Sequence, residues 1–196
     1  MSTKDLIIAE CRADGVLRNQ AAYVLATAAW ETNHTFEPVR EAYWVKDAEA
    51  WRKKNLRYYP WYGRGLVQLT WEDNYRRAGK AIGVDLIKNR DAALEPGNAV
   101  KILVKGMIEG WFTGKKLSDY ITLKRSEFIA ARAIINGKDK AQEIAALAMK
   151  YDAELLAAGY GVDDGWTTDM NPREEPRARS WIVAIIDFIL SLFKRR

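Results

Sequence analysis

The sequence predicts a mainly α-helical domain, followed by a linker and a short amphipathic helix at the C-terminus. Three observations lead to this fold class. Apolar residues recur at helical spacing through most of residues 5–158. Strands and helices do not alternate, which argues against a doubly wound α/β fold. The chain of 196 residues is 48% apolar and 29% charged, a composition typical of a globular domain with a substantial core.

The first two helices are expected over residues 5–12 and 19–33, with Asn19 as the cap of the second. Residues 35–65 then break the helical pattern with prolines and glycines and are crowded with tyrosines and tryptophans. This composition predicts an irregular segment that lines a surface, with room for a short hairpin. A ligand is therefore expected to bind in this region.

Helical spacing resumes after Thr70, which forms a T-x-x-D pattern with Asp73 that is typical of a capping box. Further helices are expected over residues 98–113, 126–135 and 139–158. Gly137 and Gly159 would end the last two, because glycine readily adopts a positive φ. The predicted catalytic domain therefore covers residues 1–158.

Residues 159–179 are rich in glycine, proline and charge and are predicted to form a linker. Residues 180–196 contain the run WIVAIIDFILSLF followed by Lys194, Arg195 and Arg196. A helix of this run would be about 20 Å long at ~1.5 Å per residue, shorter than a hydrocarbon core of ~30 Å. It is predicted to lie in a membrane interface, as a cationic amphipathic helix, or else to dock on the domain.

Composition restricts the chemistry and the partners. Cys11 has no second cysteine with which to pair, and a chain with one cysteine and one histidine offers few ligands for zinc, so metal-free chemistry without a cofactor is expected. The net charge of +5 and the pI of about 9.2 favour an anionic partner. The N-terminal residues lack the apolar run of a secretory signal, so synthesis in the cytoplasm is expected.

A pair of carboxyl groups would suit hydrolysis of a glycosidic bond without metal, one as proton donor and one as base or nucleophile. Glu31 is the candidate acid, because Val24 and Ala28 precede it on one helix face and would give it apolar surroundings. Glu41 is the candidate base and Glu37 its rival. A continuous helix would separate Glu31 from Glu41 by about 15 Å, so the chain is expected to turn back at Pro38.

Residues 58–75 carry the strongest motif. The run YGRGLVQLT followed by an Asn-Tyr pair resembles the Y-G-R-G-x-x-Q-L-[ST] signature of glycoside hydrolase family 19, which contains chitinases and phage endolysins. Trp30-Glu31-Thr32 is similar to the family's H-E-[ST] segment, with tryptophan in place of histidine, and ARAIING at residues 131–137 is similar to a segment that ends in Asn-Gly. The resemblance covers roughly residues 22–147.

The resemblance implies a lysozyme-like helical fold and a role for each matching residue. Glu31 would be the general acid, and Glu41 would hold the attacking water together with Thr70. The substrate-binding residues would be Gln68, Asn74, Tyr62, Arg64 and Asn136. Arg64 could equally anchor its own loop, and Thr70 could also cap a helix.

These expectations lead to an endolysin that hydrolyses the glycan strands of bacterial peptidoglycan. It is expected to act in the periplasm as a monomer and to bind outer-membrane or anionic lipid through its C-terminal helix. A chitinase of the same family remains open, as does a lytic transglycosylase, which would need only one acid. From another class, the chain could be a membrane-permeabilising effector. A nucleic-acid binder is disfavoured, because the basic residues are interspersed with acidic ones.

Overall fold

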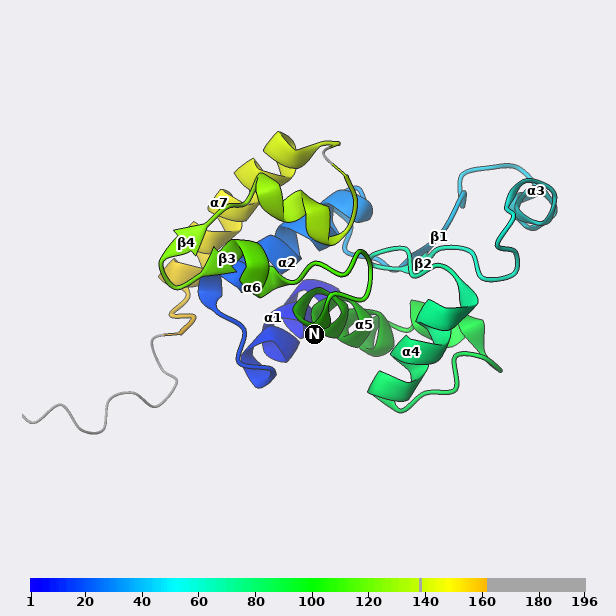
Figure 1. The fold of residues 1–196 in the computed structure, drawn as a ribbon, viewed down its shortest axis with the longest axis horizontal. Helices are drawn as coiled ribbons and strands as arrows, with labels where there is room; N and C mark the ends of the chain where they lie inside the picture. Colours follow the sequence, from blue (N-terminus) through cyan, green and yellow to red (C-terminus); the bar gives the residue numbers. More distant parts are fainter. Residues whose placement is uncertain (138, 162–196) are drawn as a thin grey trace, which may run out of the picture. The chain divides into compact units, whose positions relative to one another are not determined.

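The computed structural model describes residues 1–137 and 139–161, and the chain forms a compact unit over Met1–Gly161. The predicted C-terminal helix, residues 180–196, and most of the predicted linker lie outside the described residues. Within the described residues the structure is mainly helical, as predicted (Figure 1). None of the helices described is long and apolar enough to cross a membrane.

The first two helices are α1 (Thr3–Ala13) and α2 (Arg18–Glu31). Ser2 caps α1 through a reciprocal pair of hydrogen bonds with Asp5. The prediction that Asn19 caps α2 is wrong, because the helix begins one residue earlier. The Asn19 amide instead donates to the carbonyl of Thr122 and the hydroxyl of Ser126, at 2.8 Å each.

Helix α2 is the centre of the core. Its residues from Ala21 to Ala29 are all buried, and many of them are alanines, whose small side chains allow other helices to approach closely. It packs mainly against α7 (Ala141–Ala157), while α1 packs against α5 (Pro96–Glu109). In Figure 1, α2 and α7 lie side by side on one side of α5, with α4 (Glu72–Ile82) on the other.

The aromatic region forms a long excursion closed at its base by two short strands. Strand β1 (Val39–Arg40) pairs antiparallel with β2 (Arg64–Gly65), which confirms that a small strand pair lies here. The segment between them also contains α3 (Ala48–Asn55), which the sequence analysis missed. Figure 1 shows α3 at the far end of this excursion, away from the helices of the core.

The capping box predicted at Thr70 does not form. Helix α4 begins at Glu72 after Trp71, and the Thr70 hydroxyl donates to the carbonyl of Gln68 at 2.8 Å. The 3₁₀ helix η1 (Arg90–Leu94) follows and packs between β2 and α5. Helix α5 begins at Pro96, as is common for the first residue of a helix, and covers most of the predicted residues 98–113.

The segment before α7 differs most from the prediction. Helix α6 (Leu117–Tyr120) leads into a hairpin of β3 (Ile121–Thr122) and β4 (Arg125–Ser126), followed by the 3₁₀ helix η2 (Ala130–Ile134). The helix predicted over residues 126–135 is therefore wrong in its first part. Ser126 pairs with Ile121 across the hairpin, and this tertiary pairing overrides the helical spacing of the apolar residues.

The compact unit ends just after α7. Gly159 adopts a positive φ of 72°, as predicted for the end of this helix. Tyr160 is then buried in the core, and its hydroxyl donates to the carbonyl of Val16 at 2.8 Å. Cys11 is completely buried as a free thiol, and its burial raises its pKa.

Candidate active site

Glu31 is the last residue of α2, and a buried arginine holds its carboxylate. Nη1 of Arg132 donates to Oε1 of Glu31 at 2.9 Å, and Nε of the same arginine donates to the carbonyl of Asp139 at 3.1 Å. The side chain of Arg132 is 6% exposed and that of Glu31 is 20% exposed. Glu31 is therefore fixed in orientation and still open to solvent, as a group that meets a substrate must be.

The prediction that Glu31 has apolar surroundings is only partly correct. Val24 and Ala28 are completely buried on α2, as the spacing suggested, but Glu31 reaches beyond the core and meets Arg132. The sequence analysis missed Arg132, which comes from η2 and is 101 residues away in the chain. The available signal was its place in the ARAIING segment, where only Asn136 had been singled out.

The chain turns back after Glu31, as predicted, but it does so before Pro38. Thr32 ends the helix: its hydroxyl donates to the carbonyl of Ala28 at 2.7 Å and accepts from the backbone N–H of Phe36 at 2.9 Å. Positive φ angles at Asn33, His34 and Phe36 complete the turn. Trp30, which stands where the family signature has histidine, is partly buried against the core.

Glu41 directly follows β1 and is held by four hydrogen bonds. Its Oε1 accepts from the hydroxyl of Tyr58 at 2.7 Å and its Oε2 from the backbone N–H of Gly63 at 2.8 Å. Its own N–H donates to the carbonyl of Gly63 at 2.8 Å, and its carbonyl accepts from Nε of Arg52 at 2.6 Å. Side chain and backbone are thus both fixed at the base of the excursion.

The carboxylate of Glu37, the rival candidate, is not held by comparable hydrogen bonds in the described part of the chain. It lies on the exposed turn before β1, and only its backbone N–H is engaged, with the hydroxyl of Thr35 at 3.2 Å. In the described part of the chain, no hydrogen bond or ion pair reaches its carboxylate. Among the described residues, Glu41 is thus the one of these two carboxylates that the fold holds in a fixed orientation.

The polar side chains of the signature form a connected series along the loop after β2. The Gln68 amide donates to the carbonyl of Val39 at 3.2 Å, Thr70 donates to the carbonyl of Gln68, and the Asn74 amide donates to the carbonyl of Thr70 at 2.9 Å. All three side chains are only partly buried. They brace the loop while keeping polar atoms at its surface.

Arg64 lies inside the loop. It is 4% exposed, and its guanidinium donates to Asp91 at 2.8 Å, to the hydroxyl of Tyr75 at 2.9 Å and to the carbonyls of Pro60 and Tyr62 at 3.2 Å each. It also stacks on the ring of Tyr62, 3.7 Å from the centroid. Of the two roles left open for Arg64, these contacts favour anchoring of the loop.

The two glycines beside Arg64 lie at close contacts. A Cβ at Gly63 would lie 2.5 Å from Oε1 of Gln68. Gly65 has a φ of +92°, and a Cβ there would lie 3.0 Å from the carbonyl oxygen of Ala93. The Gly-Arg-Gly run is thus explained by packing between this loop, the Gln68 side chain and η1.

Tyr62 and Asn136 complete the predicted residues. Tyr62 is 3% exposed, and its hydroxyl donates to Oε2 of Glu49 at 3.1 Å. Asn136 is exposed at the end of the η2 segment, where its side-chain oxygen accepts from the backbone N–H of Gly137. Asn136 is therefore accessible to a ligand. Tyr62 is buried, and a ligand could contact it only inside the cavity that it lines.

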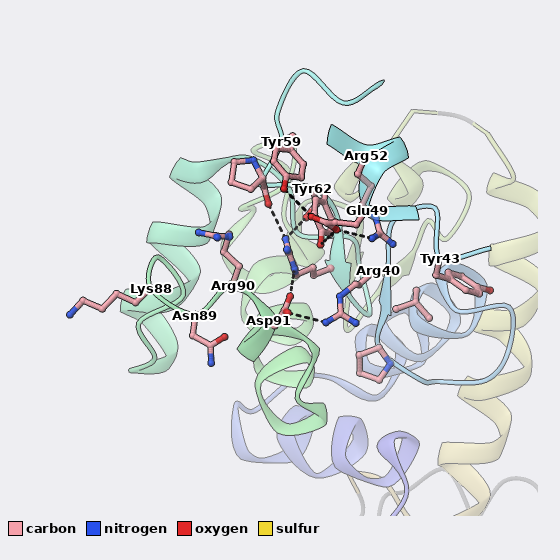
Figure 2. Close-up of a pocket in the computed structure, with 14 residues that line it drawn as sticks. Arg40, Tyr43, Glu49, Arg52, Tyr59, Tyr62, Lys88, Asn89, Arg90 and Asp91 are labelled. Carbon is pink, nitrogen blue, oxygen red and sulfur yellow. Dashed lines mark hydrogen bonds and ion pairs between the residues drawn. The ribbon is translucent and has the colours of Figure 1, made fainter. Parts of the chain in front are cut away.

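A cavity of about 870 Å³ adjoins this region (Figure 2). Its wall includes β1, α3, the end of the excursion and the residues around η1. Tyr62 and Arg64 belong to its lining, whereas Glu31 and Glu41 do not. Among the described residues, no group of three or more histidine, cysteine or acidic side chains is placed to hold a metal ion.

Comparisons with known proteins agree on one family. The family model "Chitinase class I", glycoside hydrolase family 19, matches residues 19–119, which include Glu31, Glu41 and the whole signature loop. The fold is similar to that of chitinase C from Streptomyces griseus HUT6037, with a TM-score of 0.55 and 23% identity over 71% of this chain and 60% of that one.

Short stretches are similar in sequence to plant enzymes. Basic endochitinase B of Arabidopsis thaliana is 44% identical over 55 residues, and chitinase 8 of Oryza sativa subsp. japonica is 56% identical over 32 residues. These stretches cover 28% and 16% of this chain, but only 16% and 12% of the plant proteins. By the family model that matches half of its length, the chain belongs to the class I chitinase family, glycoside hydrolase family 19.

Proposed function

We propose that this protein is a glycosidase of bacterial peptidoglycan, in which Glu31 is the general acid and Glu41 the general base. The observation that carries the proposal is the pair of carboxylates held on separate supports, Glu31 by Arg132 and Glu41 by Tyr58 and Gly63. Both carboxylates lie within the stretch matched by the family model. A glycosidase needs two such groups, fixed on either side of the bond to be cut.

In the proposed reaction, Glu31 gives its proton to the glycosidic oxygen as the bond to the anomeric carbon breaks. Glu41 takes a proton from a water molecule that attacks the same carbon, with the Thr70 hydroxyl as a further contact for that water. Gln68, Asn74 and Asn136 would hydrogen-bond the hydroxyl and acetamido groups of the sugars. Two separate supports allow the acid and the base to keep their spacing while a sugar ring lies between them.

Peptidoglycan as the substrate is supported by charge. The protein carries a net charge of +5, and peptidoglycan bears carboxylates on its peptide stems, whereas chitin is neutral. A chitinase is the second candidate, and it is favoured by the similar proteins, all of which are named chitinases or endochitinases. The two candidates share one reaction and differ in the substituents on the sugar.

The cellular role remains part of the proposal. A phage endolysin made in the host cytoplasm would reach the periplasm and degrade the wall, and the apolar and cationic residues 180–196 would bind anionic lipid. A membrane-permeabilising effector is the alternative from a different class. It would act through residues 180–196 alone and would leave purified peptidoglycan intact.

The test is mass spectrometry of the fragments released from purified peptidoglycan and from chitin oligosaccharides. We expect the wild type to release muropeptides with reducing ends, and Glu31→Gln and Glu41→Gln to be nearly inactive, while the exposed Glu37→Gln serves as the matched control and stays active. Anhydro-muropeptides together with an active Glu41→Gln would identify a lytic transglycosylase. Products from chitin alone would identify a chitinase, and no products from either substrate would refute the glycosidase.

A further inference from the structure

The cavity beside the signature loop carries more positive than negative charge. Five basic and two acidic side chains belong to its wall, together with neutral residues of β1 and of the segment that contains Tyr59 and Pro60 (Figure 2). The basic residues are Arg40, Arg52, Arg64, Lys88 and Arg90, and the acidic ones are Glu49 and Asp91. Such an excess inside a concave surface attracts anions.

Both acidic side chains are engaged by the wall itself. Burial raises the pKa of Asp91, but hydrogen bonds from Arg40 and Arg64 outweigh this effect and hold the pKa below its ordinary value of 3.8. The pKa of Glu49 is also lowered: burial raises it, but hydrogen bonds from Tyr59, Tyr62 and Arg52 together outweigh that effect. At neutral pH both groups are ionised, and each is already paired with arginines of the wall.

Among the residues that the structure describes, two of these basic side chains have no strong carboxylate partner. Lys88 is 87% exposed, and its one ion pair, to Asp85, is 3.4 Å long. Arg90 stacks on Trp61, 5.0 Å from the ring centroid, and donates a long hydrogen bond of 3.4 Å to the carbonyl of Ile87. Figure 2 shows Lys88, Asn89 and Arg90 on one side of the cavity, opposite Tyr43, with the side chain of Lys88 extending outward at the rim, away from Arg90.

The cavity is next to Glu41 in the chain and in the hydrogen-bond network. Arg40 immediately precedes Glu41, and Arg52 donates to the carbonyl of Glu41 at 2.6 Å. Tyr62, another residue of the wall, precedes Gly63, whose N–H binds the carboxylate of Glu41. The wall of the cavity therefore adjoins the backbone that supports Glu41.

We propose that this cavity binds a carboxylate of the peptide substituent on the glycan, with Arg90 as its partner and the ammonium of Lys88 as a further charge at the rim. The inference rests on the proposed function, because it names the part of the substrate that distinguishes peptidoglycan from chitin. A guanidinium can bind a carboxylate through two parallel hydrogen bonds, and an ammonium at the rim adds a flexible charge. The exposed ring of Tyr43 offers an apolar face for the rest of the substituent.

The test compares three substrates: peptidoglycan with its stem peptides, the same material with its carboxylates converted to amides, and neutral chitin oligosaccharides. The variants of the full-length protein are Lys88→Gln and Arg90→Gln, singly and combined. Arg90→Lys restores the charge, and Lys101→Gln on the exposed face of α5 makes the same change of charge elsewhere.

We expect the double variant to raise KM for the carboxylate-bearing substrate about tenfold, the equivalent of one lost charge-assisted contact, with little change in kcat. Amidation of the substrate should raise KM of the wild type by a similar factor and abolish the difference between wild type and variant. Arg90→Lys should recover part of the loss, Lys101→Gln should resemble the wild type, and 0.5 M salt should reduce the effect.

Two kinds of failure can be told apart. If the wild type cuts peptidoglycan and the variants lose affinity equally for amidated and unmodified material, or lose none, the cavity does not recognise carboxylates and the inference is overturned. If the wild type releases nothing from peptidoglycan, the proposed function itself fails. Binding of peptide-bearing and amidated muropeptides to Glu31→Gln, followed by tryptophan fluorescence, then decides whether the cavity still prefers the carboxylate.

Discussion

The guanidinium of Arg132 joins two segments that are far apart in the sequence, because it donates both to Glu31 and to the carbonyl of Asp139. Replacement by alanine should leave the acid without its support, and misplacement by about 1 Å can cost on the order of a hundredfold in rate. We expect kcat of Arg132→Ala to fall by that factor with KM nearly unchanged, as measured by release of reducing ends.

Arg132→Lys should recover part of the activity, since it keeps the charge but lacks the guanidinium whose separate nitrogens reach both Glu31 and the carbonyl of Asp139. Arg125→Ala is the matched control, because Arg125 is an exposed arginine of β4 paired with Glu127. A thermal melt of each variant separates loss of positioning from loss of folding. Full activity in Arg132→Ala would contradict the role given to this residue.

Tyr58 supports the second carboxylate in a similar way. Burial and then the hydrogen bond to Glu41 raise the pKa of Tyr58 to about 12, so the hydroxyl remains a donor over the whole working range of an enzyme. Tyr58→Phe removes this donor, and a hydrogen bond to a charged group is worth about 1.5 kcal/mol or more. We expect kcat to fall by about tenfold.

Tyr59→Phe is the comparison for Tyr58, because the neighbouring hydroxyl donates to Glu49 and not to Glu41. Its kcat on a neutral oligosaccharide should stay within about twofold of the wild type. Equal losses in the two variants would show that the excursion responds as a unit and that the bond to Glu41 has no special importance.

At the scale of the element, two buried threonines, Thr27 within α2 and Thr32 directly after its last residue, have opposite surroundings. Among the described residues, the hydroxyl of Thr27 is buried without a hydrogen-bond partner, whereas that of Thr32 has two. Thr27→Val should leave the free energy of unfolding unchanged or raise it by about 1 kcal/mol, while Thr32→Val should lower it by ~1 to 2 kcal/mol. Urea denaturation of both variants measures the difference, and an equal loss would mean that Thr27 has a partner such as a buried water.

Asp91 joins three elements, because it binds Arg40 of β1 and Arg64 of β2 from its place on η1. Its folded-state pKa is depressed, so its contribution to stability is present above its ordinary value of 3.8 and is lost as the pH falls through the lower folded value. Asp91→Asn should therefore lower the urea midpoint at pH 6 but change it little at pH 2. A decrease of the same size at both pH values would contradict this linkage.

The predicted elements differ in how well local sequence determined them. The end of α7 at Gly159 and the start of α5 near Pro96 follow from glycine and proline, whose backbone preferences are local. The roles of Asn19 and Ser126 could not be predicted from local pattern, because each is decided by a hydrogen bond to the other across 107 residues. The sequence leaves room for a short hairpin in the aromatic region, but the pairing of Val39 with Gly65 follows only from the folded excursion.

The residues of the candidate site also differ in whether the sequence alone could point to them. Glu31, Glu41 and the loop from Tyr62 to Tyr75 could be identified in the sequence, because the signature has many fixed residue types at fixed spacing. The ARAIING segment points to the region of Arg132, but the partners of Arg132 and Arg52 could not be identified, since each arginine meets its carboxylate or carbonyl only in the folded chain. A single sequence contains no information on such pairs.

At the scale of the whole molecule, the compact unit extends to Gly161, and Tyr160 belongs to its core. A protein that ends after Gly161 should keep its activity on purified peptidoglycan, if the described unit is the enzyme. A protein that ends after Gly159 should be less stable by ~3 kcal/mol or more, the usual cost of removing a large buried side chain. Thermal melts and fragment release from both proteins test the two statements, and loss of activity in the longer one would favour the membrane-permeabilising effector.

The strand pair that closes the aromatic excursion has a consequence for how this scaffold can change. Residues 41–63 leave the core at Arg40 and return at Arg64, and the pairs Val39 with Gly65 and Arg40 with Arg64 fix both ends. The entropy of closing a loop grows only with the logarithm of its length, so doubling this segment would cost about 0.6 kcal/mol. Insertions near α3, at the far end of the excursion, could thus change which polymers the protein binds without altering the helices of the core.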